Sequence, residues 1–531
     1  MKKFTFLCLA GLLILAVSSA YARDKFEMKI SGFIDAQSLW MLNVTGGNRA
    51  TGVYNAVDAN YMPVNWTATQ IGYPYNYVTA PPAARAPIHN GFNKSEALME
   101  SRTRLKFDAV MGKSLSGTIF FEMDSQPWGN PPGGNAGLVT ERNSYGYWSG
   151  DRAAVEIKDI YIDWGVPGIP VPMTVRVGLQ PLAIRPNLLL TTDGMAVTAG
   201  IKIDPVMIMP MWAKAVEGRN WNADDVDVYG LNVNAKLGTF TVGGYGLYYN
   251  MNSYPLFNPA PTWGSYQASM WWLGLYADGK AGPVDLNFDF IYDTGKVMRP
   301  GTETIAFPKV KYSGWATRLK IDFPWEKFNF GAVGHYASGA DREKTSSTGL
   351  PGTATDTGVA SSKVGSYVVP PGSEAGTNYG ESLVIYNSWI NRGDSGVGTS
   401  LNYNSMSRGP IGGTWMAKAY ASVKATPWYK ATFQVLYIGD TTQHGNTFGT
   451  AYASPFPVPG MAIRRDDSSI GWEFDLIHEI QIYKNLKYAI GMGYLFAGKA
   501  MDYGYIGPGG LQYNVSPKNP WNITTNLTYN F

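Results

Sequence analysis

The segment from Trp521 to Phe531 alternates strictly between two kinds of residue. Every odd position is apolar, aromatic or Thr, and every even position is Asn or Thr. A period of two places each kind on its own face of a strand, so that one face suits hydrocarbon and the other suits water. The chain must therefore fold into a sheet that separates an apolar surface from an aqueous space.

The sequence ends on an aromatic residue, Phe531, with Tyr529 two positions earlier. This ending resembles the C-terminal assembly signal of bacterial outer-membrane proteins, which implies the barrel-assembly machinery as a partner. Strand propensity alone leaves an alternative, because an edge strand of a soluble sandwich also favours aromatic and β-branched residues.

The other end of the sequence predicts export. Lys2 and Lys3 precede an apolar run over residues 4–17, and small residues follow as far as Ala22. This order is typical of a secretory signal peptide, 1–22, cleaved after Ala22 to leave residues 23–531. The apolar run is too short for a membrane anchor, which needs ~20 residues. The only cysteine, Cys8, lies within the signal, so we expect the exported chain to contain no disulfide.

Composition narrows the class further. Aromatic residues make up 14% of the chain and charged residues 16%, and the net charge is only +3. The mean hydropathy of -0.15 is not that of a helical membrane protein. Nothing resembles a basic nucleic-acid-binding face, so we expect no nucleic-acid partner. An exported β protein remains, either secreted or inserted into the outer membrane.

Two-residue alternation recurs along most of the chain, for example over residues 284–293 and 417–424. Tight turns, such as 112–114 and 484–485, alternate with long connections rich in Gly, Pro, Asn and Ser, such as 339–413. Short periplasmic turns and long extracellular loops are typical of membrane barrels. The sequence predicts an all-β fold, a transmembrane antiparallel up-and-down β-barrel of about 18 strands, with sixteen as the alternative.

A barrel of that size encloses an aqueous channel, and its narrowest part determines what passes. The segment near 181–196 is the best candidate for an infolded constriction loop. Its Leu188, Leu189 and Leu190 would seldom occur in an exposed loop but could be buried against the inner wall. The alternative is that these leucines belong to a strand or a subunit contact.

Charged residues at inward positions of neighbouring strands are the candidate constriction residues. A basic wall that faces acidic groups would set up a transverse electric field across the aperture and favour polar solutes. The alternative is that these are solvated charges spread around the barrel. The candidates are Arg102, Arg104, Lys106, Glu122, Asp124, Arg176, Arg185 and Asp193.

The motifs of common enzymes and metal sites are missing from the sequence. No two of the four histidines have metal-ligand spacing, and His478-Glu479 lacks the second histidine of a zinc helix. No nucleophile elbow or phosphate-binding loop occurs. We therefore expect no enzyme activity, no cofactor and no metal. A barrel hydrolase built on His478 is the remaining enzymatic alternative.

Several motifs resemble the outer-membrane homotrimeric porins of sulphate-reducing and related Gram-negative bacteria. The likeness extends over most of residues 23–531 and is carried by segments 120–124, 157–164, 176–180, 471–475 and 493–498. It implies a homotrimer in outer-membrane lipid that lets small hydrophilic solutes and ions diffuse passively. A substrate-specific channel for sugars or organic acids is one alternative function. The other is a structural or surface-binding barrel that acts through its long loops.

Overall fold

The computed structural model describes residues 25–44, 94–128, 155–218, 225–256, 266–298, 309–344, 362–375, 379–387, 406–449, 451–453, 464–506 and 512–531. The predicted signal peptide, 1–22, lies outside the described residues. No helix within these ranges has the length and apolar character needed to span a membrane.

Strands account for most of the described chain. In order they are β1 (Phe26–Val44), β2 (Lys94–Met111), β3 (Leu115–Pro127), β4 (Val155–Gly165), β5 (Met173–Ile184), β6 (Leu190–Ile203), β7 (Val206–Val216), β8 (Val226–Leu237), β9 (Phe240–Tyr254), β10 (Tyr266–Ala281), β11 (Val284–Met298), β12 (Lys309–Trp325), β13 (Phe328–Ala337), β14 (Lys363–Val364), β15 (Thr414–Thr426), β16 (Tyr429–Asp440), β17 (Ser469–Tyr483), β18 (Leu486–Ala497), β19 (Tyr503–Ile506), β20 (Gln512–Val515) and β21 (Trp521–Asn530). A short 3-10 helix, η5 (Lys499–Met501), follows β18.

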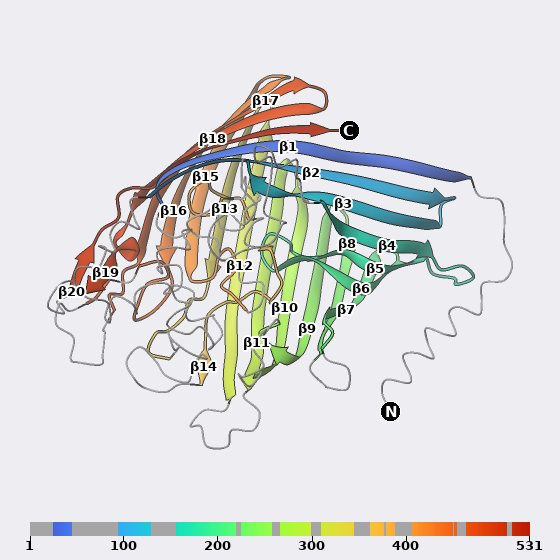
Figure 1. The fold of residues 1–531 in the computed structure, drawn as a ribbon, viewed down its shortest axis with the longest axis horizontal. Helices are drawn as coiled ribbons and strands as arrows, with labels where there is room; N and C mark the ends of the chain where they lie inside the picture. Colours follow the sequence, from blue (N-terminus) through green and yellow to red (C-terminus); the bar gives the residue numbers. More distant parts are fainter. Residues whose placement is uncertain are drawn as a thin grey trace, which may run out of the picture.

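Eighteen of the described strands form one closed antiparallel barrel. Each pairs with its neighbour along the chain, and β1 pairs with both β2 and β21, which closes the sheet on itself. Figure 1 shows the last strand running beside β1. The two-residue β14 adds a parallel pairing to β12, and β19 pairs with β20 outside the barrel. The predicted barrel of about 18 strands is confirmed, and the alternative of sixteen is wrong.

The two faces of each strand carry opposite kinds of side chain, as the alternation predicts. On β21, Asn522 and Thr524 point inward and are buried, whereas Leu527 and Tyr529 are exposed on the outside. Elsewhere the exposed outer side chains include Leu275, Phe433 and Trp472. A soluble protein buries such residues, but here they form the outer surface, and an apolar exterior of this kind suits hydrocarbon.

The connections differ in length between the two ends of the barrel. At one end the strands are joined by tight turns, as between β2 and β3 (112–114), β6 and β7 (204–205), and β17 and β18 (484–485). At the other end lie the long connections, including the one from β13 to β15. By strand order, the turn between β5 and β6, residues 185–189, belongs with the long connections, but it is short.

The seam between β1 and the end of β21 is closely packed. The backbone N–H of Gly32 donates to the carbonyl of Phe531 over 3.0 Å, and the N–H of Phe531 donates back to Gly32 over the same distance. A Cβ on Gly32 would lie 2.9 Å from the Phe531 ring and would also collide with the backbone oxygen of Arg104. Only glycine fits this seam without a shift of the strands.

We therefore expect Gly32→Val to weaken closure of the barrel. Overpacking of this kind costs about 1–3 kcal/mol, and here it also disturbs the hydrogen bonds that join first and last strands. The measurement is the fraction of protein that migrates as a folded, heat-modifiable barrel in electrophoresis. Gly117→Val on β3 is the matched control, because no atom lies within 4 Å of its added Cβ. Equal folded fractions for the two variants would contradict the expectation.

Candidate constriction inside the barrel

The segment predicted to fold inward, 181–196, is the tip of the β5–β6 hairpin. The pairing of β5 with β4 ends at Leu179, and the pairing of β6 with β7 begins at Met195. In between, Gln180–Gly194 pairs across its own turn. This hairpin tip (residues 180–194) has no ladder hydrogen bonds to β4 or β7. It can therefore bend away from the barrel wall into the interior. It is strand on both sides of a short turn, whereas the sequence suggested a loop.

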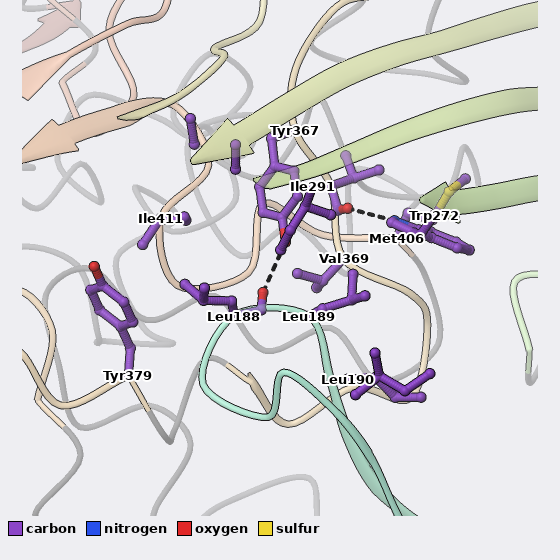
Figure 2. Close-up of a cluster of buried hydrophobic side chains, with 14 of the residues drawn as sticks. Leu188, Leu189, Leu190, Trp272, Ile291, Tyr367, Val369, Tyr379, Met406 and Ile411 are labelled. Atoms are coloured by element: carbon purple, nitrogen blue, oxygen red, sulfur yellow. Dashed lines mark hydrogen bonds between the residues drawn. The ribbon is translucent and has the colours of Figure 1, made fainter. Parts of the chain in front are cut away.

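The hairpin tip meets a second segment inside the barrel. This segment belongs to the long β13–β15 connection, and we call its described residues, 362–375 and 379–387, the strap. The Tyr367 hydroxyl donates to the carbonyl of Leu188 over 2.9 Å, and the Ser373 hydroxyl donates to that of Leu189 over 2.7 Å. Figure 2 shows the leucines facing Tyr367 and Val369 in one buried cluster.

The strap is also attached to β10 and β11. The indole N–H of Trp272 donates to the carbonyl of Val368 over 2.8 Å, drawn as a dashed line in Figure 2. The carboxylate of Asp293 accepts the N–H of Val368 over 3.1 Å and that of Gly314 over the same distance. Trp272 and Asp293 are fully buried, so these polar groups take the place of water for the strap backbone.

A carboxylate on β17 holds the next part of the strap. Glu473 accepts the consecutive backbone N–H groups of Leu383 at 3.0 Å, Val384 at 2.6 Å and Ile385 at 3.2 Å. Consecutive N–H groups that converge on one anion form an anion-binding nest. On β21, the side-chain amide of Asn522 donates to the carbonyl of Leu383. The polar face of the last strand is therefore turned toward the strap.

Glu381 of the strap makes a buried ion-pair cluster with two strands. Its carboxylate lies 2.6 Å from Arg318 Nη2 on β12 and 2.5 Å from Lys418 Nζ on β15. Burial raises the pKa of Glu381, but the opposing charges of Lys418 and Arg318 outweigh it and lower the pKa to about 2. The ionised form therefore stabilises the docked strap fully above the ordinary pKa, and that contribution is lost only as the pH falls toward 2.

Four of the candidate constriction residues gather on the wall opposite Glu381. Glu122 on β3 is ion-paired with Arg104 and lies 3.6 Å from Arg102, both on β2. Lys158 on β4 joins them, 3.7 Å from Glu122 and 2.5 Å from Asp193 on the hairpin tip. The predicted juxtaposition of basic and acidic groups is present here.

Glu374 of the strap contacts the hairpin tip beside this wall. Its backbone N–H donates to the carbonyl of Thr191 over 2.8 Å. Burial is the main cause that raises the pKa of Glu374, partly offset by the positive charges of Lys158 and Arg102. The strap therefore contributes an acidic group next to the basic residues of the wall.

The remaining candidates lie apart from this group. Lys106 pairs with Asp108 at 3.1 Å, and Arg176 pairs with Asp163 at 2.7 Å. Both pairs lie between the group around Glu122 and the tight-turn end of the barrel. Arg185, in the hairpin turn, lies 2.8 Å from Asp278 and also pairs with Asp289. The backbone of Asp124 is in β3, but its side chain lies outside the described part of the structure.

Sequence reasoning missed Lys158, Glu374 and Glu381. The register between β3 and β4 shifts at Phe120/Phe121, so Lys158 sits in a β-bulge and points inward together with its neighbour Asp159. Strict alternation cannot anticipate this. Glu374 and Glu381 are in a long connection with no periodicity. The acidic residues Glu473 and Asp475 at inward positions on β17 were a usable signal for a docked loop.

One cluster in the described residues has ligand atoms close enough for a metal ion. Atoms of Asp341, Glu343 and His444 lie within 4.8 Å of one another. The Lys344 ammonium is 2.5 Å from Asp341 and already supplies a positive charge there. We therefore assign no metal to this cluster.

No family model matches the chain, and no curated protein is similar to it in sequence. Solved structures from Pseudomonas aeruginosa are similar in fold. OpdQ aligns with a TM-score of 0.45 at 8% identity, over 95% of this chain and 97% of its own. OccK8 (OprE) aligns with a TM-score of 0.45 at 10% identity, over 95% and 98%. Values this low carry no argument about activity or substrate.

We expect Glu381→Gln to loosen the strap. The change leaves the buried Lys418 without its ion-pair partner and Arg318 with only the more distant Asp289, 3.9 Å away. Breaking a buried ion pair in this way costs about 3–5 kcal/mol. The measurement is the rate at which chymotrypsin cleaves the folded barrel after Tyr367, Tyr379 or Tyr386. Asp285→Asn is the control, because its ion pair with Lys280 is exposed to solvent. A strap as resistant as in the unmodified protein would contradict the expectation.

Proposed function

We propose that the protein is a porin of the bacterial outer membrane, through which small hydrophilic solutes and ions diffuse passively. The observation that carries the proposal is a closed barrel with an apolar exterior and a narrowed, charged interior. Eighteen strands enclose more space than side chains of the wall can fill. The hairpin tip and the strap occupy part of that space and leave a charged wall beside them.

The charges at the constriction support a transverse field. Arg102, Arg104 and Lys158 project from the wall, and Glu374 approaches them from the strap. Glu122 and Asp193 lie among the bases, so positive and negative groups are close to balanced. Such an arrangement orients polar solutes without strong preference for one ion sign.

The placement in the cell and the assembly are parts of the same proposal. The signal peptide over 1–22 supports export through the inner membrane, and the aromatic residues Tyr529 and Phe531 support recognition by the barrel-assembly machinery. The motifs shared with homotrimeric porins of sulphate-reducing bacteria support three copies per assembly in outer-membrane lipid.

The contact between strap and hairpin tip favours a second candidate, a substrate-specific channel for a sugar or an organic acid. An interior that is partly filled by a packed apolar cluster leaves a narrower route than an unobstructed barrel would. A narrow route discriminates by size and by hydrogen bonding, as selective pores do. This version keeps passive transport and changes only the range of solutes.

Conductance in planar bilayers tests the proposed function. We expect the purified, heat-modifiable protein to insert in stable ohmic steps, and a trimer to insert in groups of three. Solute exclusion by size then separates the general porin from the selective channel. A correctly folded barrel that never conducts would overturn the proposal and favour a barrel that acts through its outer loops.

We expect the double replacement Arg102→Ala and Arg104→Ala to increase single-channel conductance and shift ion preference toward cations. The two changes widen the aperture and leave Glu122 with Lys158 as its remaining basic partner. Reversal potentials in a salt gradient measure the shift. Lys113→Ala is the control, because it removes a positive charge from an exposed tight turn. Identical behaviour of the two variants would remove Arg102 and Arg104 from the constriction.

A further inference from the structure

The strap covers the part of the barrel wall that runs from β12 through β15 and β17 to β21. Inward side chains there are buried beneath it, although they are polar or charged. Lys418 donates a hydrogen bond to Glu381, and Asn522 donates one to the carbonyl of Leu383. Glu473 accepts a hydrogen bond from the strap backbone. Thr524, the next inward residue on β21, is 0% exposed. Charged side chains that are enclosed by protein on every side do not line a path for water.

The wall from β8 to β11 is closed in a different way. Beside the strap and the hairpin tip, its inward side chains are mainly apolar or aromatic and are buried. The charged Asp289 and Asp293 are buried there too, and Asp278, which lies nearer the tight-turn end, is partly exposed. Leu247, Tyr249, Trp272 and Ile291 belong to one cluster with Leu188, Leu189 and Tyr367. A packed apolar cluster excludes water, since its interior has no partner for hydrogen bonds. At the level of this cluster, therefore, the β8–β11 side offers no aqueous path.

The wall from β2 to β6 differs from both. The side chains of Arg102, Arg104, Lys158 and Asp193 remain 15%, 24%, 18% and 24% exposed. The corresponding values for Arg318, Lys418 and Glu381 on the covered side are 9%, 5% and 9%. Both groups are ion-paired, so pairing does not explain the difference. The strap covers one group and stands beside the other.

We propose that the strap confines solutes to the β2–β6 wall and that Lys158 determines their charge preference there. The inference rests on the proposed channel function and adds the route through it. Among the described residues at the level of the constriction, the β2–β6 wall has charged side chains that water can reach. The apolar cluster closes the β8–β11 wall there, and the strap covers the wall from β12 to β21.

Lys158 is singled out by its position between three acidic groups. Its ammonium is 2.5 Å from Asp193 and 3.7 Å from Glu122, and its charge acts on Glu374 of the strap. It therefore links the wall, the hairpin tip and the strap across the route. Without it, Asp193 would lose its ion-pair partner and Glu374 would lose one of the two positive charges that act on it.

Cysteine accessibility tests the route. The sequence contains one cysteine, Cys8, in the predicted signal peptide, so a single new cysteine reports on its own position. Asp193→Cys and Arg104→Cys lie on the proposed route, whereas Thr524→Cys is fully buried on β21, two residues from the strap contact of Asn522. Each folded variant is inserted into a planar bilayer and exposed to a negatively charged and a positively charged methanethiosulfonate reagent. We expect both reagents to change the current through the two route variants and to leave Thr524→Cys unaffected.

The outcomes separate the route from the function. A response of Thr524→Cys with none from the route variants would place the path under the strap and overturn the inference. Conduction without a response from any variant would also overturn it, because the path would then avoid both walls. A folded parent protein that does not conduct would instead overturn the proposed channel function.

A charge replacement tests the role of Lys158. We expect Lys158→Gln to raise the ratio of cation to anion permeability, because Asp193 and Glu374 lose the cation between them. Lys320→Gln is the matched control, since Lys320 is a partly exposed lumen lysine on β12, on the other side of the barrel. Lys158→Arg keeps the charge and should retain the original ratio. Equal shifts for Lys158→Gln and Lys320→Gln would show that total charge matters and that Lys158 has no special role.

Discussion

Buried carboxylates on the barrel wall that accept backbone N–H groups hold the interior of this protein together. Asp293 binds the strap near Val368, and Glu473 binds three consecutive residues from Leu383. Apart from the two-residue β14, the described strap has no regular secondary structure. It would otherwise carry unsatisfied N–H groups into the lumen, at a cost of about 1–3 kcal/mol for each buried group. The carboxylates remove that cost, and the hydrophobic contacts with the hairpin tip can then form.

The barrel therefore has two apolar surfaces with different surroundings. The outer one, which includes Leu275 and Phe433, faces outward and is exposed. The inner one, around Leu189, Trp272 and Tyr367, is a packed core enclosed by the barrel. Ion pairs lie between the two, on the inward face of the strands. In the proposed channel, a charged lining combined with an enclosed core would give a fixed shape as well as a polar route.

The fold could be predicted from the sequence because apolar and polar residues alternate with a regular period of two along the strands. Alternation along Trp521–Phe531 and the sequence of tight turns and long connections are both local signals, and the structure has the predicted strands. The constriction could be predicted only in part. Arg102, Arg104, Glu122 and Asp193 occupy regular inward positions, whereas Lys158 depends on a bulge that shifts the register. The strap depends on contacts between residues about 90 positions apart, such as Leu383 and Glu473, which no periodic pattern encodes.

The positions of the strap's partners along the chain also determine when the strap can dock during folding. Its contacts reach backward in the chain to the hairpin tip and to β11, and forward to β17 and β21, with Leu383 and Asn522 separated by 139 positions. Contacts of such long range form late, because the chain between them must first be ordered. The strap cannot make all of these contacts until β21, the last strand, is in place. Docking of the strap is therefore a late step in folding, and the proposed constriction is complete only after the last strand has formed.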